Sequence, residues 1–172
     1  MQPTSLPMPK YIFLCIGLAL SQTVWSLPSD ETKLIELSAD SADLNQKTHS
    51  GNYSGNVTYD QGTTHLRADR AVTNGNEKNK LIETIAMGSL TEQAHFWTQL
   101  SINKPIMHAY ANTIKYYPDK HLIELIGNAK VTQGKNSFQA SKISYDIVKQ
   151  QVLSNGDEKK QISIVIHPEK KA

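Results

Sequence analysis

Two stretches of the chain, "YSGNVTYDQG" (Tyr53–Gly62) and "LIGNAKVTQG" (Leu125–Gly134), lie 72 positions apart and share a pattern. Each contains Gly-Asn, and each places Gln-Gly six residues after its first glycine. Apolar and polar residues alternate around both Gly-Asn pairs, which is the period of a half-buried β-strand. We therefore predict two strands of the same design, each followed by a tight turn.

The similarity extends beyond these stretches. A shift of 72 positions also aligns three further pairs: Ala39 with Ala111, Asp40 with Asn112, and Ala68 with Ala140. After Ala68 and Ala140 the apolar period changes phase in both copies, as a β-bulge would cause. The sequence thus predicts a repeated strand unit whose copies extend one sheet system.

The remainder of the chain has the same all-β character. In "QISIVIH" (161–167) three isoleucines alternate with polar or smaller residues and predict a further half-buried strand. Turn residues separate the predicted strands in "TNGNEKNK" (73–80), "YPDKH" (117–121) and "SNGDEKK" (154–160). Since the sequence after residue 30 has no convincing helical period, we predict an all-β sandwich, roll or barrel.

The first 26 residues have the pattern of a secretory signal peptide. Lys10 precedes an apolar stretch at 11–25, and the small residues Val24 and Ser26 suit a cleavage site after Ser26. We expect Leu27 to be the first mature residue and 27–172 to form a single domain. The alternative is an uncleaved anchor, which would need about 20 strongly apolar residues to span a bilayer.

Charge and cysteine content exclude several function classes. The formal net charge is +2, without a polybasic segment, which argues against nucleic acid as a partner. Cys15 is the only cysteine and lies in the predicted signal peptide. The mature chain would then have no disulfide, cysteine-ligated metal or cysteine nucleophile.

The sequence contains no recognisable catalytic motif. The six histidines show no metal-ligand spacing, and neither a nucleophile elbow nor a phosphate-binding loop is present. Asp40 and Asp69 occupy related places in the first copy, but Asn112 and Ser141 replace them in the second. This loss of charge favours strand-end hydrogen bonds over a general base. We expect no catalytic residues, no metal and no cofactor, and hence no enzyme.

Four ordered stretches carry a family resemblance: "IELSADSADLN", "YSGNVTYDQGTTHLRADRAV", "LIGNAKVTQGKNSFQASKISYD" and "VLSNGDEKKQISIVIHP". Together they run from Ile35 to Pro168 and resemble the OstA-like (LptA-like) family of periplasmic lipopolysaccharide transport proteins. One departure is "MGSLTEQAHF", where the path from Gly88 to Ala94 is longer than in that family.

The resemblance implies an elongated, twisted antiparallel β-jelly roll with open ends, located in the periplasm. It also implies head-to-tail self-association through terminal strands. Related jelly-roll domains of an inner-membrane export complex and an outer-membrane translocon would be the other partners. Lipopolysaccharide would pass along a hydrophobic groove, its lipid A acyl chains held by apolar side chains.

Eight residues are candidates for the lining of this groove. The resemblance implies Ile35, Leu37, Phe96 and Leu125, and the period-two assignment of inward faces adds Tyr53, Leu66, Val131 and Phe138. Three other readings remain open: a membrane-anchored relative from the same pathway, a periplasmic carbohydrate-active β enzyme, and a structural envelope protein that binds no lipid.

Overall fold

The fold is built almost entirely from antiparallel β-strands. A computed structural model describes residues 30–154 and 162–168. The elements are η1 (Asp30–Thr32), β1 (Ile35–Ser38), β2 (Ser41–Asn45), β3 (Ser50–Gln61), β4 (Thr64–Gly75), β5 (Leu81–Met87), β6 (Ala94–Thr98), β7 (Met107–Ala111), β8 (Thr113–Tyr117), η2 (Pro118–Lys120), β9 (Leu122–Gln133), β10 (Asn136–Asp146), β11 (Gln151–Leu153) and β12 (Ser163–Val165). In this part of the chain no helix is long and apolar enough to cross a membrane.

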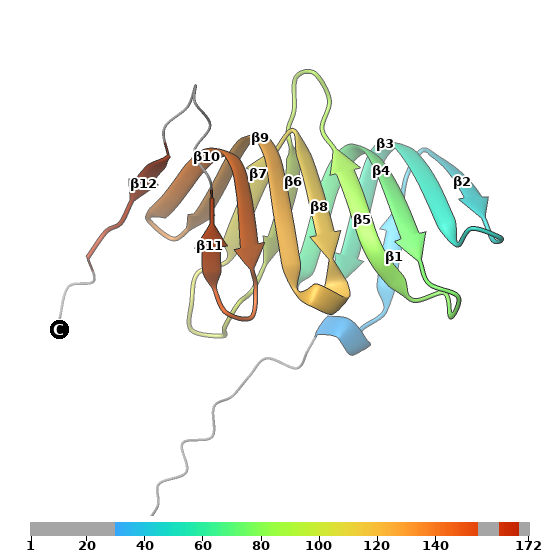
Figure 1. The fold of residues 1–172 in the computed structure, drawn as a ribbon, viewed down its shortest axis with the longest axis horizontal. Coiled ribbons are helices and arrows are strands. Elements are labelled where there is room, and N and C mark those ends of the chain that lie inside the picture. Colours follow the sequence, from blue (N-terminus) through green and yellow to red (C-terminus); the bar gives the residue numbers. More distant parts are fainter. Residues whose placement is uncertain (1–29, 155–161, 169–172) are drawn as a thin grey trace, which may run out of the picture.

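The strands form an elongated, flattened barrel with two walls (Figure 1). Strands β4, β5, β8, β9, β7 and β6 are hydrogen-bonded in a closed ring. The long strands β4 and β9 each use one half to pair with β5 or β8 and the other half to pair with β6 or β7. We call the half with β2, β5, β8 and β11 the front wall, and the half with β1, β6, β7 and β12 the back wall.

The two Gly-Asn pairs make the bends between the walls. Gly55–Asn56 on β3 opposes the single residue Asp69, and Gly127–Asn128 on β9 opposes Ser141, so each pair forms a β-bulge. All four bulge residues have positive φ, between 48° and 79°. Glycine and asparagine are the residues that adopt this conformation most readily. The sequence pattern that predicts the repeat therefore specifies where the long strands bend.

The bends are closed by equivalent backbone bonds in the two copies. The Asp40 amide donates to the Gly55 carbonyl at 2.9 Å, and the Asn112 amide donates to the Gly127 carbonyl at 2.9 Å. The carboxylate of Asp40 also accepts a hydrogen bond of 2.9 Å from the side chain of Asn56. Asp40 is thus held at the bend by strand-end hydrogen bonds, as its replacement by asparagine in the second copy predicts.

The Gln-Gly turns are also equivalent. Each closes a hairpin with a two-residue loop whose glycine has a φ near +58°. The side-chain amide of Gln61 donates to the Lys33 carbonyl at 3.2 Å. The side-chain amide of Gln133 donates to the Pro105 carbonyl at 3.1 Å. Because these partners are also separated by 72 positions, the glutamines fix the segments that lead into β1 and β7 in the same way.

These equivalences divide the molecule into two units of six strands, β1–β6 and β7–β12. Within each unit the third strand pairs with the first, second and fourth, and the fourth pairs with the fifth and sixth. The units join where β5 pairs with β8 and β6 with β7. The predicted repeat and the predicted antiparallel β-jelly roll are confirmed. The bulges lie on the Gly-Asn strands, opposite the phase changes in their partners.

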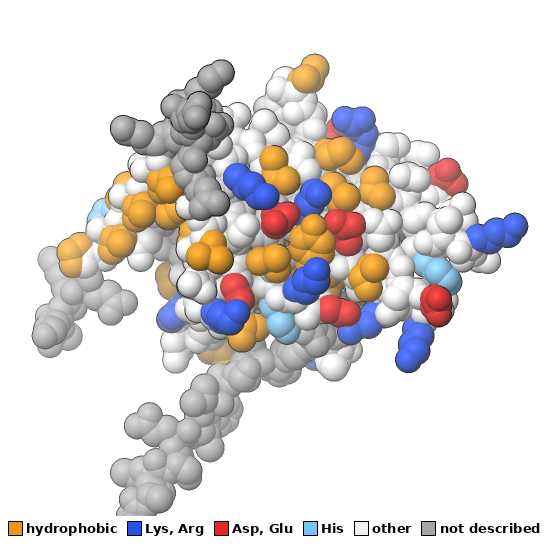
Figure 2. Space-filling view, viewed as in Figure 1, with side chains coloured by type: hydrophobic (Ala, Val, Ile, Leu, Met, Phe, Trp, Pro, Cys, Tyr) orange, Lys and Arg blue, Asp and Glu red, His pale blue; other side chains and the backbone are white. Residues whose placement is uncertain are grey.

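One predicted strand differs from expectation, and other predicted segments fall outside the described residues. In β12 the predicted buried face is open: Ile164 is 58% and Ile166 74% exposed, because β12 is the last strand of the back wall. Hydrophobic side chains gather at this end in Figure 2. The segment Gly88–Gln93 forms the loop from β5 to β6. The signal peptide and most of the predicted turn at 154–160 lie outside the described residues.

Candidate functional site: the apolar interior between the walls

One row of apolar side chains crosses the whole back wall. Strand register places its members directly opposite one another on successive strands, from β1 to β12. We call this the back row: Leu37, Tyr59, Leu66, Phe96, Ala109, Val131, Phe138 and Ile164. The six residues from Tyr59 to Phe138 belong to or pack against the buried core. The row runs through both units without a break.

A second row faces it from the front wall. Its register runs from β2 to β10 and gives what we call the front row: Ala42, Tyr53, Ala71, Ala86, Ile114, Leu125 and Ile143. The residues from Ala71 to Ile143 are buried. Where the walls meet, the Tyr116 ring of the front wall lies 5.3 Å from Phe96 and 6.2 Å from Tyr59, measured between ring centroids. The interior is therefore closed by contact between aromatic side chains.

The structure brings seven of the eight candidate residues into these two rows. Leu37, Leu66, Phe96, Val131 and Phe138 belong to the back row, and Tyr53 and Leu125 to the front row. Ile35 lies one inward-facing position further toward the edge of β1, opposite Gln61, and is 41% exposed. Other members, such as Tyr59 and Ile143, were not among the candidates. Tyr59 could have been predicted from the repeat, because a shift of 72 positions aligns it with the candidate Val131.

Polar side chains line the interior farther from the bends. On the front wall Thr73, Thr84 and Tyr116 form one register row, which continues through Ile123 to Tyr145. On the back wall Gln61 opposes Thr64, whose hydroxyl lies 3.1 Å from that of Thr98. Burial raises the pKa of the Tyr59 phenol, and the neighbouring Tyr116 and Asp30 raise it further. Its hydroxyl donates to Gln61 at 2.6 Å. The interior is apolar near the bends and hydroxyl-rich toward the opposite edge.

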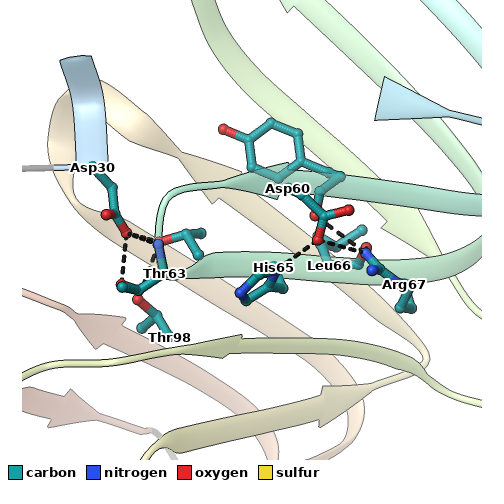
Figure 3. A network of polar contacts seen from close by, with 9 residues as sticks. Asp30, Asp60, Thr63, His65, Leu66, Arg67 and Thr98 are labelled. Atoms are coloured by element: carbon teal, nitrogen blue, oxygen red, sulfur yellow. Dashed lines mark hydrogen bonds and ion pairs between the residues drawn. The ribbon is translucent and has the colours of Figure 1, made fainter. Parts of the chain in front are cut away.

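The segment before β1 closes this edge through Asp30 (Figure 3). One Asp30 carboxylate oxygen accepts hydrogen bonds from the Thr63 amide at 3.0 Å, the Thr63 hydroxyl at 2.8 Å and the Thr64 hydroxyl at 2.9 Å. Since the Thr64 proton is donated to Asp30, the hydroxyl of Thr98, 3.1 Å away, donates to Thr64. The chain entering β1 is thus fixed to the first hairpin turn.

Figure 3 also shows Asp60 on the outer side of the same hairpin, between His65 and Arg67. Burial alone would raise the pKa of the Asp60 carboxyl, but hydrogen bonds to His65 and Arg67 outweigh this effect and lower it. Arg67 in turn lies 5.2 Å over the Trp97 ring. Among the described residues, no three His, Cys, Asp or Glu side chains form a group that could hold a metal ion.

Stacked rings extend from Trp97 across the outside of the back wall. His65 and His95 stack on Trp97 at centroid distances of 5.0 and 4.5 Å, and Tyr110 stacks on His95 at 4.2 Å. Burial lowers the pKa of His95 to about 4, helped by His108 and Arg67. His95 is therefore neutral at pH 7. The rings cover one another's faces, which identifies the stack as packing on the outer surface of the sheet.

One cavity lies on the outer surface of the barrel, and another lies at one end of it. One of about 290 Å³ lies on the outer surface, between the first bulge and the loop 88–93, with polar residues including Arg67 and Glu92 in its wall. The other, of about 210 Å³, lies at the β2 end of the barrel and is lined by Leu44, Tyr53, Thr73 and Leu81, among others. The second opens onto side chains of the front wall interior.

The curated proteins most similar in sequence include two lipopolysaccharide export proteins. The chain is 34% identical over 173 residues to the lipopolysaccharide export system protein LptH of Pseudomonas aeruginosa, with 96% of each chain covered. It is 29% identical to the lipopolysaccharide export system protein LptA of Haemophilus influenzae, covering 92% of this chain and 91% of LptA.

The fold agrees with a solved structure. The crystal structure of Pseudomonas aeruginosa LptH, described as the LptA-homologous periplasmic component of the conserved lipopolysaccharide transport device, matches with a TM-score of 0.74 at 29% identity. The match covers 82% of this chain and all of that one. The family model "LptA/(LptD N-terminal domain) LPS transport protein" matches residues 36–151, so the chain belongs to this family.

Proposed function

We propose that the protein is a periplasmic lipopolysaccharide carrier, in which the space between the walls receives the acyl chains of lipid A. The observation that carries this proposal is the back row, an apolar stripe that continues from β1 to β12 through both units. Acyl chains have no hydrogen bonds to offer and are best held by aliphatic and aromatic side chains. Each methylene removed from water contributes about 0.8 kcal/mol. The proposal contains no catalytic step.

The test is photo-crosslinking with pairs of neighbouring positions that face opposite ways. A photoreactive residue replaces Phe96 or Leu125 on the inside, and Trp97 or Glu124 as the outward control. Lipopolysaccharide adducts are expected at the two inner positions and not at the controls. Equal labelling of inner and outer positions would refute binding between the walls.

Head-to-tail assembly is part of the proposal, and the internal junction supplies its register. Between the units, β6 pairs with β7 so that Phe96 opposes Ala109. Leu66 and Phe138 are equivalent residues of the two units. Leu66 opposes Phe96 and Phe138 opposes Ile164, so Ile164 is the counterpart of Phe96. Leu37 is the counterpart of Ala109, because they precede Tyr59 and Val131 in the same register row. A copy joined in the same way would place its Ile164 against Leu37 of the next copy.

This contact would remove exposed apolar surface at both ends. By the same register Ile166 would oppose Ile35 of the next copy, and both are exposed in the single chain. Unpaired edge strands are templates for strand addition, and a head-to-tail contact does not close on itself. Related jelly-roll domains of an inner-membrane complex and an outer-membrane translocon would bind the same two edges.

A cysteine pair tests the register. In the mature chain, L37C combined with I164C is expected to give a ladder of covalent oligomers under mild oxidation. The control combines L37C with V165C, whose side chain faces the other side of β12. Ladders of equal intensity from both pairs, or none from the first, would show that the terminal strands do not join in this register.

Export by a cleaved signal peptide completes the proposal. Intact-mass measurement of the protein recovered from the periplasm should identify Leu27 as the first residue. Retention of residues 11–26 on a membrane-bound protein would instead favour the anchored relative.

A further inference from the structure

One hydroxyl in the interior lacks a partner. The side chain of Thr84 is 1% exposed, and its oxygen finds no hydrogen-bond partner among the described residues. Thr84 lies on the same face of β5 as Ala86 of the front row and therefore points between the walls. A buried hydroxyl left without a partner costs about 1–3 kcal/mol. A buried hydroxyl of this kind needs an explanation, and a bound ligand that supplies the missing bond is one.

The neighbours of Thr84 make this hydroxyl part of a polar strip. In strand register Thr84 lies between Thr73 on β4 and Tyr116 on β8. The Thr73 hydroxyl donates to the Tyr53 hydroxyl at 3.4 Å. The cavity of about 210 Å³ at the β2 end includes Tyr53 and Thr73 in its wall, so the strip begins at an opening. A ligand entering there meets hydroxyls on one side and the apolar rows on the other.

The distribution of polar groups matches one kind of acyl chain. The front and back rows are apolar near the bends. The polar strip lies one inward-facing position farther from the bends on the front wall. A simple alkyl chain leaves the Thr84 hydroxyl unpaired wherever it lies. A chain bearing a hydroxyl on its third carbon has a donor and acceptor close to its polar end and an alkyl tail beyond it.

We propose that Thr84 forms a hydrogen bond with the hydroxyl of a 3-hydroxyacyl chain and so favours such chains over unsubstituted ones. This inference rests on the proposed function and refines it, because it names the acyl class and a residue that recognises it. On binding, the buried Thr84 hydroxyl gains the hydrogen-bond partner that it lacks. The alkyl tail packs against Ile114, Phe96 and their neighbours in the two rows.

The test compares two ligands and three variants. Calorimetric titration of the mature chain measures the affinities for 3-hydroxytetradecanoate and tetradecanoate, both as monomers. T84V has nearly the shape of the native side chain without its hydroxyl, and T84S restores a hydroxyl. T58V is the matched control, because Thr58 lies on the outer face of β3.

We expect T84V to weaken 3-hydroxytetradecanoate binding by about fivefold and to leave tetradecanoate binding unchanged. T84S should keep the native preference, and T58V should change neither affinity. T84V should also raise the urea midpoint, because it removes an unsatisfied buried group. A gain in stability together with a selective loss of affinity cannot result from misfolding.

Two negative results have different meanings. If both fatty acids bind the native chain and T84V affects them equally or not at all, the role of Thr84 is wrong while binding between the walls stands. If neither fatty acid binds and Phe96 gives no lipopolysaccharide adduct, the carrier function itself fails and the Thr84 inference falls with it.

Discussion

Replacing Gly127 by alanine tests whether the Gly-Asn bulge sets the bend between the walls. Gly127 has a φ of +79°, and an added Cβ would lie 2.8 Å from the Asn112 side-chain nitrogen and 3.1 Å from its Cβ and Cγ. The left-handed conformation costs a residue with a side chain about 1 kcal/mol relative to glycine. Relieving the contact with Asn112 adds about 1–2 kcal/mol. We expect G127A to lower the free energy of unfolding by about 2–3 kcal/mol.

Urea unfolding followed by circular dichroism measures this loss, and a thermal scan should show a decrease in Tm of about 8 °C for a chain of this size. The steric part can be separated from the backbone part by adding N112A. The double variant G127A/N112A should lose less than the sum of the two single variants, because the clash is absent. The backbone part should remain, since N112A does not change φ at residue 127.

The repeat makes an independent check available in the first unit. An added Cβ at Gly55 would collide with the carboxylate of Asp40, the counterpart of Asn112, and Gly55 has a φ of +76°. G55A should therefore cost about as much as G127A, and D40A should partly relieve it. A loss below about 0.5 kcal/mol at both glycines, within the range of ordinary surface substitutions, would refute the assignment of the bend to these bulges.

Three further predictions address the core, the edge and the outer surface. L125A removes a fully buried side chain of the front row and should cost about 3 kcal/mol in urea unfolding, whereas I126A on the opposite face of β9 should cost less than half of that. D30A removes the acceptor of three hydrogen bonds at the first hairpin and should cost about 1–2 kcal/mol, with D43A on exposed β2 as an inert control. The pKa of His95 is about 4 in the fold and near 6.5 unfolded, so the unfolded chain binds the proton first as the pH falls. Stability should fall between pH 6.5 and 4, by about 1 kcal/mol after allowance for the partly exposed ring, and H95Q should remove this part of the pH dependence.

The parts of the fold that sequence analysis predicted are those fixed by local chemistry. Gly55 and Gly127 need a positive φ, and each Gln-Gly turn needs a glycine in the same conformation, so spacing alone identifies the repeat. Inward faces follow from the two-residue period, which explains why Tyr53, Leu66, Val131 and Phe138 fall into the two rows. The other three candidates in these rows came from the family resemblance. The pairings of β4 with β6 and of β7 with β9, which close the ring, depend on distant strands and have no local signature.

The polar features of the site were not predicted for the same reason. Thr73, Thr84 and Tyr116 come from three strands, and only the register of those strands makes them neighbours. Asp30 lies more than thirty positions from the turn that it caps. The exposure of Ile164 shows a different limit. Its alternating pattern predicts a buried face, but the strand that would bury it lies outside the single chain and, in our proposal, belongs to the next copy.

The closed interior agrees with a carrier through which lipid moves. Tyr116 meets Phe96 and Tyr59 across the barrel, so aromatic side chains of the two walls pack against one another. An acyl chain that separates these rings exchanges contacts between walls for contacts of the same apolar kind, each aromatic pair contributing only about 0.5–1.5 kcal/mol beyond burial. Because every member of the back row is apolar, a chain that advances by one strand would, in our proposal, lose and regain similar contacts. In that proposal the row would hold a lipid without trapping it at any one position, as passage through a series of joined copies would require.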